Sequence, residues 1–238
     1  IVRTYVPDEP DAEKVDKEWF SHTRFGDLLK HSVLKSSGDT LTDVYDYKYC
    51  RQTLLAKHSR LLNGKILDME ELVYDSVRNG RCMLYMPTQI LKGIPGKMEI
   101  RTRYSHYDTY GNPTVRDEDG VVTIYLWGYR GQYPVAKIEN STYAEVQQAL
   151  GRLPESCSSA ITYESVVATL REKLFGARVS TSKYLFSVGL TGKTDPAGRQ
   201  MEYNYDSQGR LIETCRFNEQ GQRNLTGFHQ YHLVNESN

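Results

Sequence analysis

Histidines and carboxylates are the residues of this chain whose spacing could support acid–base or metal chemistry. One pair, His229 and His232, is separated by three positions. A helical zinc motif places its histidines four positions apart with a glutamate between them, and this pair has neither feature. His106 and Asp108 would share one face of a strand, where a solvated pair is a simpler interpretation than a catalytic dyad. We therefore expect no catalytic residue, no metal site and no cofactor.

Other patterns typical of enzymes are also missing from the sequence. There is no nucleophile elbow, P-loop or dinucleotide fingerprint. The spacing of the four cysteines matches no zinc or thioredoxin motif, and we expect them to be free: Cys50, Cys82, Cys157 and Cys215.

Composition limits the classes of partner. The 238 residues include 30 Lys and Arg against 30 Asp and Glu, so net charge gives no reason to expect nucleic acid. No stretch of 18 apolar residues predicts a membrane span. Tyrosine is abundant, with 18 Tyr against 6 Phe, and its amphipathic ring suits a half-buried sheet face. Because the chain begins with Ile1, we expect it to be part of a longer polypeptide.

A short motif recurs five times and indicates the elements that would position these residues. It consists of Asp or Asn, two further residues and Gly, and it occurs at Asp108–Gly111, Asp117–Gly120, Asp195–Gly198, Asp206–Gly209 and Asn218–Gly221. An Asp or Asn that opens a turn accepts hydrogen bonds from the turn's backbone, and Gly tolerates the left-handed conformation at its end. Runs rich in tyrosine and β-branched residues lie between the motifs. The pattern predicts antiparallel hairpins.

Two of these sites resemble a known repeat. Tyr203-Asn-Tyr205-Asp206-Ser-Gln-Gly209-Arg210-Leu211 is similar to the core of the YD repeat, also called the RHS repeat, and residues 104–112 form a divergent copy. Residues 217–222 and 125–139 are weaker matches, so the resemblance covers roughly residues 98–234. It implies tandem β-hairpins that build extended sheets, coiled into a hollow shell in larger members, and a bacterial surface or secreted location.

The repeat has two interpretations at the level of single residues. In the first, the tyrosines pack between hairpins, and the turn residues are structural: Asp108, Gly111, Asp195, Gly198, Asp206, Gly209 and Arg210. In the second, exposed rings form a stacking platform for sugars, with Tyr104, Tyr107, Trp127, Tyr203 and Tyr205 as the candidate ligand-binding residues. The Asp195-Pro196 pair resembles an element near the self-cleavage site of some YD-repeat toxins, but we interpret Asp195 as a turn residue.

A helical segment interrupts the hairpins. Thr142-Tyr-Ala-Glu145 is a capping-box signature that precedes good helix formers up to Leu150. A second helix is predicted from Tyr163 to Phe175, with Val166, Val167, Leu170 and Leu174 on one face. We expect a helical hairpin that covers the sheet. The alternative is a partner-binding groove made by exposed apolar stripes.

These observations predict a mainly β fold of stacked antiparallel hairpins in an extended or curved sheet, with a two-helix insertion. The expected regions are a degenerate β-repeat (1–97), hairpins (98–139), a helical insertion (140–176) and hairpins (177–238). The expected function is a non-catalytic structural or binding module of a surface or secreted protein, for adhesion or carbohydrate binding. The alternative is a fragment of an RHS-type toxin-encapsulating shell. Expected partners are neighbouring repeats, and glycans or surface proteins.

Overall fold

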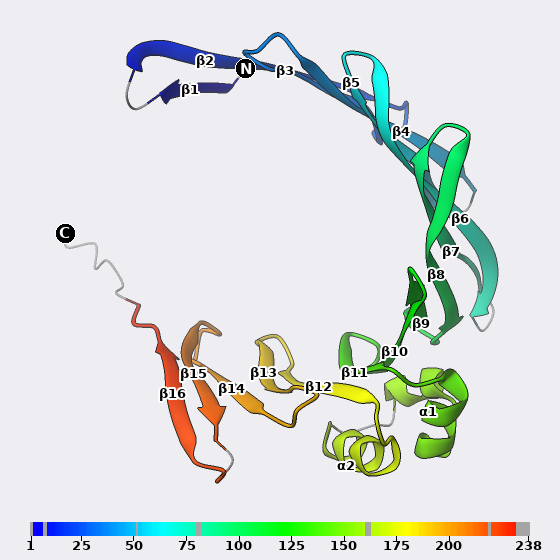
Figure 1. Ribbon diagram of the computed structural model, residues 1–238, viewed down its shortest axis with the longest axis vertical. Helices are drawn as coiled ribbons and strands as arrows, with labels where there is room; N and C mark the ends of the chain where they lie inside the picture. The colour runs from blue at the N-terminus through cyan, green and yellow to red at the C-terminus, as the bar shows by residue number, and fades with distance from the viewer. Residues whose placement is uncertain are drawn as a thin grey trace. The chain divides into compact units, whose positions relative to one another are not determined.

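A computed structural model describes residues 2–6, 9–50, 52–79, 82–159, 163–218 and 220–231. They form two compact units, one comprising Ile1–Arg78 with Met83–Arg103, the other Asn79–Cys82 with Tyr104–Asn238. Figure 1 traces both units along the chain. In each unit a strand is hydrogen-bonded to the strands that precede and follow it in the sequence. The ladders between the described strands are antiparallel. The predicted fold class, mainly β with a two-helix insertion, is confirmed.

The first unit is a meander of long hairpins. Its strands are β1 (Val2–Val6), β2 (Glu9–His22), β3 (Leu28–Leu34), β4 (Thr40–Tyr49), β5 (Thr53–Leu62), β6 (Lys65–Asn79), β7 (Cys82–Ile94) and β8 (Lys97–Tyr107), the last of which extends into the second unit. The described part of this unit contains no helix. Few of its described apolar side chains are buried, among them Val33, Leu54 and Met69. The backbone ladders therefore contribute a large share of the order in this unit.

The second unit contains shorter hairpins and the helical insertion. Its strands are β9 (Pro113–Glu118), β10 (Val121–Gly128), β11 (Tyr133–Glu139), β12 (Arg178–Leu185), β13 (Gly189–Thr194), β14 (Gln200–Tyr205), β15 (Leu211–Phe217) and β16 (Arg223–Phe228). Helix α1 (Tyr143–Leu150), the 3₁₀ helix η1 (Pro154–Ser159) and helix α2 (Tyr163–Lys173) connect β11 to β12 (Figure 1).

The helices and three strands of the second unit enclose its hydrophobic core. The core residues come from β10, β11, β12, both α-helices and the residue that follows α2, and they are Ile124, Leu126, Val135, Ala136, Ile138, Val146, Ala149, Val166, Leu170, Leu174 and Val179. Complete burial of one such Leu or Ile side chain contributes about 1.5–3 kcal/mol. The apolar face of α2, continued by Leu174, is therefore buried within its own unit, as expected for helices that cover the sheet. The alternative, a partner-binding groove, is wrong for Val166, Leu170 and Leu174. The side chain of Val167 lies outside the described residues.

Six of the described hairpins end in the same three-residue turn. In each, the first residue's N–H donates to the carbonyl four residues later, and the glycine at the fourth position donates back to the first residue's carbonyl. The turns begin at Thr23, Lys35, Asp108, Asp195, Asp206 and Asn218, and their glycines have φ between 73° and 93°. This is a type I turn closed by a left-handed residue, a common hairpin connection.

Two features of these turns differ from the sequence pattern. The Asp117 motif is instead a two-residue hairpin, because Asp119 (φ 51°) and Gly120 (φ 85°) both have positive φ and Glu118 pairs with Val121. That conformation is the type I′ turn that Asp-Gly favours. The turns at Thr23 and Lys35 were not found in the sequence, because their first residue is neither acidic nor an amide.

Candidate functional site

The turn residues of the repeat are occupied by contacts within their own hairpins. Asp206 accepts hydrogen bonds from the backbone N–H groups of Gln208 and Arg210, both at 2.9 Å, and an ion pair joins its carboxylate to the Arg210 guanidinium at 2.7 Å. The backbone N–H of Arg210, helped by its guanidinium, holds the pKa of Asp206 below its ordinary value. Gly209 has φ 76°, which an L-residue adopts with strain.

The other turns repeat this arrangement with different side chains. Asp195 pairs with the Arg199 guanidinium at 2.6 Å and accepts from the Arg199 backbone N–H at 3.0 Å. Asp108 accepts from the backbone N–H and the side-chain amide of Asn112, at 2.8 and 3.1 Å. Gly111 and Gly198 end these turns with φ 88° and 81°. The Asp195-Pro196 step is thus part of an ordinary hairpin turn.

A second recurring contact joins the two strands of a hairpin at its open end, and we call it the clasp. An aromatic side chain on one strand, or just beyond it in the case of Tyr231, donates a hydrogen bond to a backbone carbonyl at or near the start of the strand before. The clasps are Tyr47 to Leu28 (3.0 Å), Tyr74 to Leu55 (2.9 Å), Trp127 to Pro113 (3.0 Å), Tyr205 to Leu190 (2.8 Å) and Tyr231 to Leu211 (3.0 Å). Four clasps use a tyrosine hydroxyl, and the fifth uses the indole N–H of Trp127.

The register of the ladders explains why clasps are needed. The β13–β14 ladder ends at the pair Gly192–Glu202, two residues after Leu190 and three residues before Tyr205. The carbonyl of Leu190 therefore lies just beyond the ladder, and the Tyr205 hydroxyl supplies the missing donor. In all five clasps, the acceptor is two residues and the donor three residues from the last ladder pair.

The five predicted ligand-binding rings lie on three strands and are half-buried. Tyr104 and Tyr107 are on β8, where burial raises the pKa of Tyr107. Trp127 and Tyr205 are clasp donors on β10 and β14. The Tyr203 hydroxyl lies 3.8 Å from the sulfur of Met201, two positions away on its own strand. The polar atoms of Trp127 and Tyr205 are therefore already engaged by protein groups.

An aromatic cluster that was not predicted lies at one end of β10, β11 and β12. The rings of Tyr133 and Tyr184 stack with centroids 4.4 Å apart, and Tyr129 meets both edge-on. The Tyr129 hydroxyl accepts a hydrogen bond from the Tyr184 backbone N–H at 2.9 Å, where the β12–β13 register shifts. Burial raises the pKa of Tyr184. The tyrosine-rich run 125–133 was the sequence signal for this cluster.

Among the described residues, no three His, Cys, Asp or Glu side chains gather as the ligands of a metal ion would. The His106 ring stacks on Tyr143 with centroids 4.0 Å apart. His232 of the His229 pair lies outside the described residues. Cys50, Cys157 and Cys215 are free, and burial raises the pKa of Cys157 to about 11, whereas the Cys82 side chain lies outside the described part of the chain. Within the described residues, no helix combines the length and apolar character needed to cross a bilayer.

Comparison with known proteins gives only remote similarities. No protein-family model and no curated protein matches the chain. A structure of the Photorhabdus luminescens Tc holotoxin pore aligns at 8% identity and TM-score 0.48, and the TcdB2-TccC3-Cdc42 complex at 9% and 0.44. Both alignments cover 94% of this chain and 11% of the matched chain. A porin-like protein from Bacteroides uniformis aligns over 91% of this chain and 89% of its own, at 11% identity and TM-score 0.20.

Proposed function

We propose that this chain is a non-catalytic structural module, a set of tandem hairpins whose signature residues shape the turns and tie neighbouring strands together. The observation that carries the proposal is the set of five clasps with a common register. A residue whose polar atom completes the backbone hydrogen bonding of a neighbouring strand is committed to the fold. The turn carboxylates of Asp195 and Asp206 are committed in the same way.

The natural partner of such a module is more of the same repeat. Strands that pair only with their neighbours in the sequence can be added one hairpin at a time, as in other repeat proteins. The resemblance of Tyr203–Leu211 to the YD repeat supports a place in a longer surface or secreted protein. A wall segment of an RHS-type shell is the more specific form of this proposal, since a shell needs sheet that extends by repetition.

The structural role of the Tyr205 hydroxyl can be tested by substitution, with Tyr203 on the same strand as the control. Tyr205→Phe removes the hydroxyl that binds the Leu190 carbonyl, and we expect the free energy of unfolding to fall by about 1 kcal/mol. Tyr203→Phe removes a hydroxyl whose contact is a weak acceptor, the Met201 sulfur, and the expected loss is under about 0.5 kcal/mol. Urea titration followed by far-ultraviolet circular dichroism measures both. Equal losses from the two variants would refute the clasp.

A further inference from the structure

A shallow depression lies on one face of β2, β3 and β4, in the first unit. It has a volume of about 380 Å³, and it is lined by Trp19, Phe20, Ser21, Lys30, Ser32 and Thr40. All of these side chains except that of Phe20 share a face of the sheet, because Trp19 pairs with Ser32, Ser21 pairs with Lys30, and alternate residues of a strand point to the same side. We call this surface the Trp19 shelf.

The shelf combines an exposed ring with ordered hydroxyl groups. The Trp19 side chain is 50% exposed, so one face of the indole is open to a ligand. Ser32 is only 8% exposed and forms the floor, where its hydroxyl bonds to that of Thr42 at 3.1 Å. Ligand sites generally pair aromatic surface with a few placed polar groups in this way.

The charge of the shelf favours an anionic group. Lys30 is exposed on the shelf and forms no ion pair with a carboxylate among the described residues. The residues that line the depression include no Asp or Glu. A ligand carboxylate placed here would meet an unpaired ammonium and no repelling charge.

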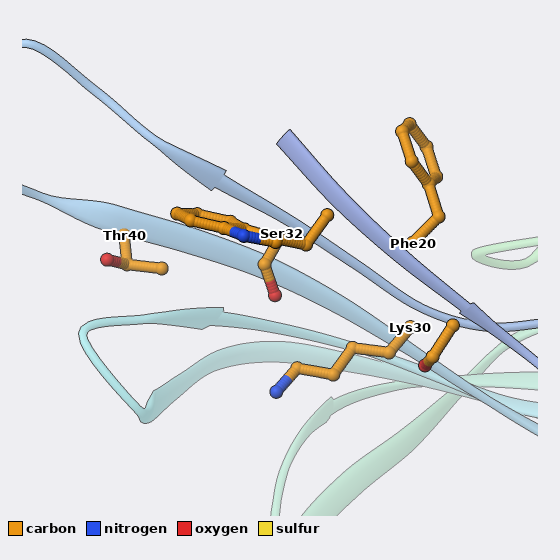
Figure 2. A pocket seen from close by; sticks show the side chains of 6 residues that line it. Phe20, Lys30, Ser32 and Thr40 are labelled. Atoms are coloured by element: carbon orange, nitrogen blue, oxygen red, sulfur yellow. The ribbon is translucent and has the colours of Figure 1, made fainter. Parts of the chain in front are cut away.

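The opposite face of the same strands has a different character. Figure 2 shows the Phe20 ring directed away from Lys30, Ser32 and Thr40. Phe20 stacks on His31 with centroids 4.6 Å apart, and the His31 imidazole lies 3.7 Å from the Glu18 carboxylate. Trp19 and Phe20 are adjacent and similarly exposed, at 50% and 57%. Phe20 also lines the depression, but it pairs with His31, so its side chain lies on the face opposite to those of Trp19 and Lys30. Phe20 is therefore a matched control for Trp19.

We propose that the Trp19 shelf binds an acidic oligosaccharide, a chain of sugars that carries carboxylates. The C–H bonds on one face of a pyranose ring are polarised positive and suit the negative face of the indole. The serine and threonine hydroxyls donate to and accept from sugar hydroxyls, and Lys30 pairs with the carboxylate. This inference is independent of the clasps, which involve none of these residues.

The test is a titration of the whole chain with trigalacturonate, followed by the tryptophan indole N–H signals in NMR spectra. The chain has two tryptophans, and Trp127 is an internal reference because its N–H is bound to the Pro113 carbonyl. We expect a saturable shift of the Trp19 signal and none of the Trp127 signal. Trp19→Ala abolishes saturable binding, measured by calorimetry, whereas Phe20→Ala leaves the affinity within twofold.

The contribution of charge is tested with Lys30→Met and with the methyl ester of trigalacturonate. A partly exposed ion pair is worth up to about 1 kcal/mol, so we expect Lys30→Met to weaken trigalacturonate binding roughly threefold to fivefold. The same variant leaves binding of the ester unchanged. The proposal is overturned if the Trp19 signal does not shift, which is the result expected if the shelf docks a protein instead. It is also overturned if Phe20→Ala loses as much affinity as Trp19→Ala, or if the ester binds the wild-type protein as tightly as the acid does.

Discussion

At the scale of single residues, the turn is built by the side chain at its first position. Asp206, Asn218 and Thr23 each accept backbone N–H bonds from the second and fourth residues that follow. Carboxylate, amide and hydroxyl oxygens are interchangeable here because the turn requires only an acceptor of the right reach. A pattern limited to Asp and Asn therefore missed Thr23. Lys35 was missed because its turn keeps the same backbone bonds without an acidic or amide side chain.

Asp206→Asn should make the fold less sensitive to acid. The folded-state pKa of Asp206 is lowered, so its contribution to stability is complete above the unfolded value of about 3.9 and is lost as the pH falls through the folded value. Asparagine keeps the turn, as Asn218 does, but does not titrate. We expect the melting temperature of Asp206→Asn to fall less than that of wild type between pH 5 and pH 2.5. An identical pH dependence would contradict this role.

At the scale of elements, structure that depends on neighbouring residues could be predicted from the sequence, whereas contacts between distant residues could not. The capping box at Thr142 is present, with the Glu145 N–H donating to the Thr142 hydroxyl at 3.3 Å and the Thr142 N–H donating to the Glu145 carboxylate at 2.7 Å. It lies within four residues and was evident from the sequence. A clasp joins residues 14 to 20 positions apart, and its partner is fixed by ladder register, which no local pattern specifies.

Thr142→Ala should destabilise the helical insertion. Loss of an N-cap hydroxyl costs about 1 kcal/mol, and α1 has only eight residues over which to absorb it. Thr142→Asn retains an acceptor at the cap and is expected to stay within about 0.5 kcal/mol of wild type. Urea unfolding monitored by circular dichroism compares the three proteins. If alanine and asparagine are equally destabilising, the cap is not the cause.

At the scale of the whole molecule, the sequence indicated the fold class more clearly than the positions of its contacts. Tyrosine abundance and turn motifs predicted hairpins, because both act within single strands and turns. A helical hairpin that covers the sheet was expected, and α1 and α2 do pack with β10–β12 around the hydrophobic core. The repeat pattern made Tyr104, Tyr107, Trp127, Tyr203 and Tyr205 the candidates for a sugar platform. It did not point to the exposed ring of Trp19, which lies in a region without a clear repeat motif.

A chain built from tandem clasped hairpins should tolerate removal of one whole period better than removal of part of a period. Leu190 and Leu211 are equivalent clasp acceptors, and the residues from 190 to 210 form one period between them. Removing that period joins Gly189 to Leu211, so that Leu211 takes the place of Leu190 after the Leu185 turn and keeps its clasp with Tyr231. Removing only residues 190–199 deletes nearly all of β13, including Leu190, so the Tyr205 hydroxyl loses its clasp acceptor.

Thermal unfolding of these two deletion variants tests the central claim, that the chain is a series of clasped hairpins. We predict that the variant lacking 190–210 keeps a cooperative transition by circular dichroism. Its melting temperature is lowered by loss of the hydrogen bond from Arg171 to the Asp195 carbonyl. The variant lacking 190–199, although it loses fewer residues, should unfold at a lower temperature or without cooperativity. A shorter deletion as stable as the full period, or a full-period deletion that does not fold, would contradict the account.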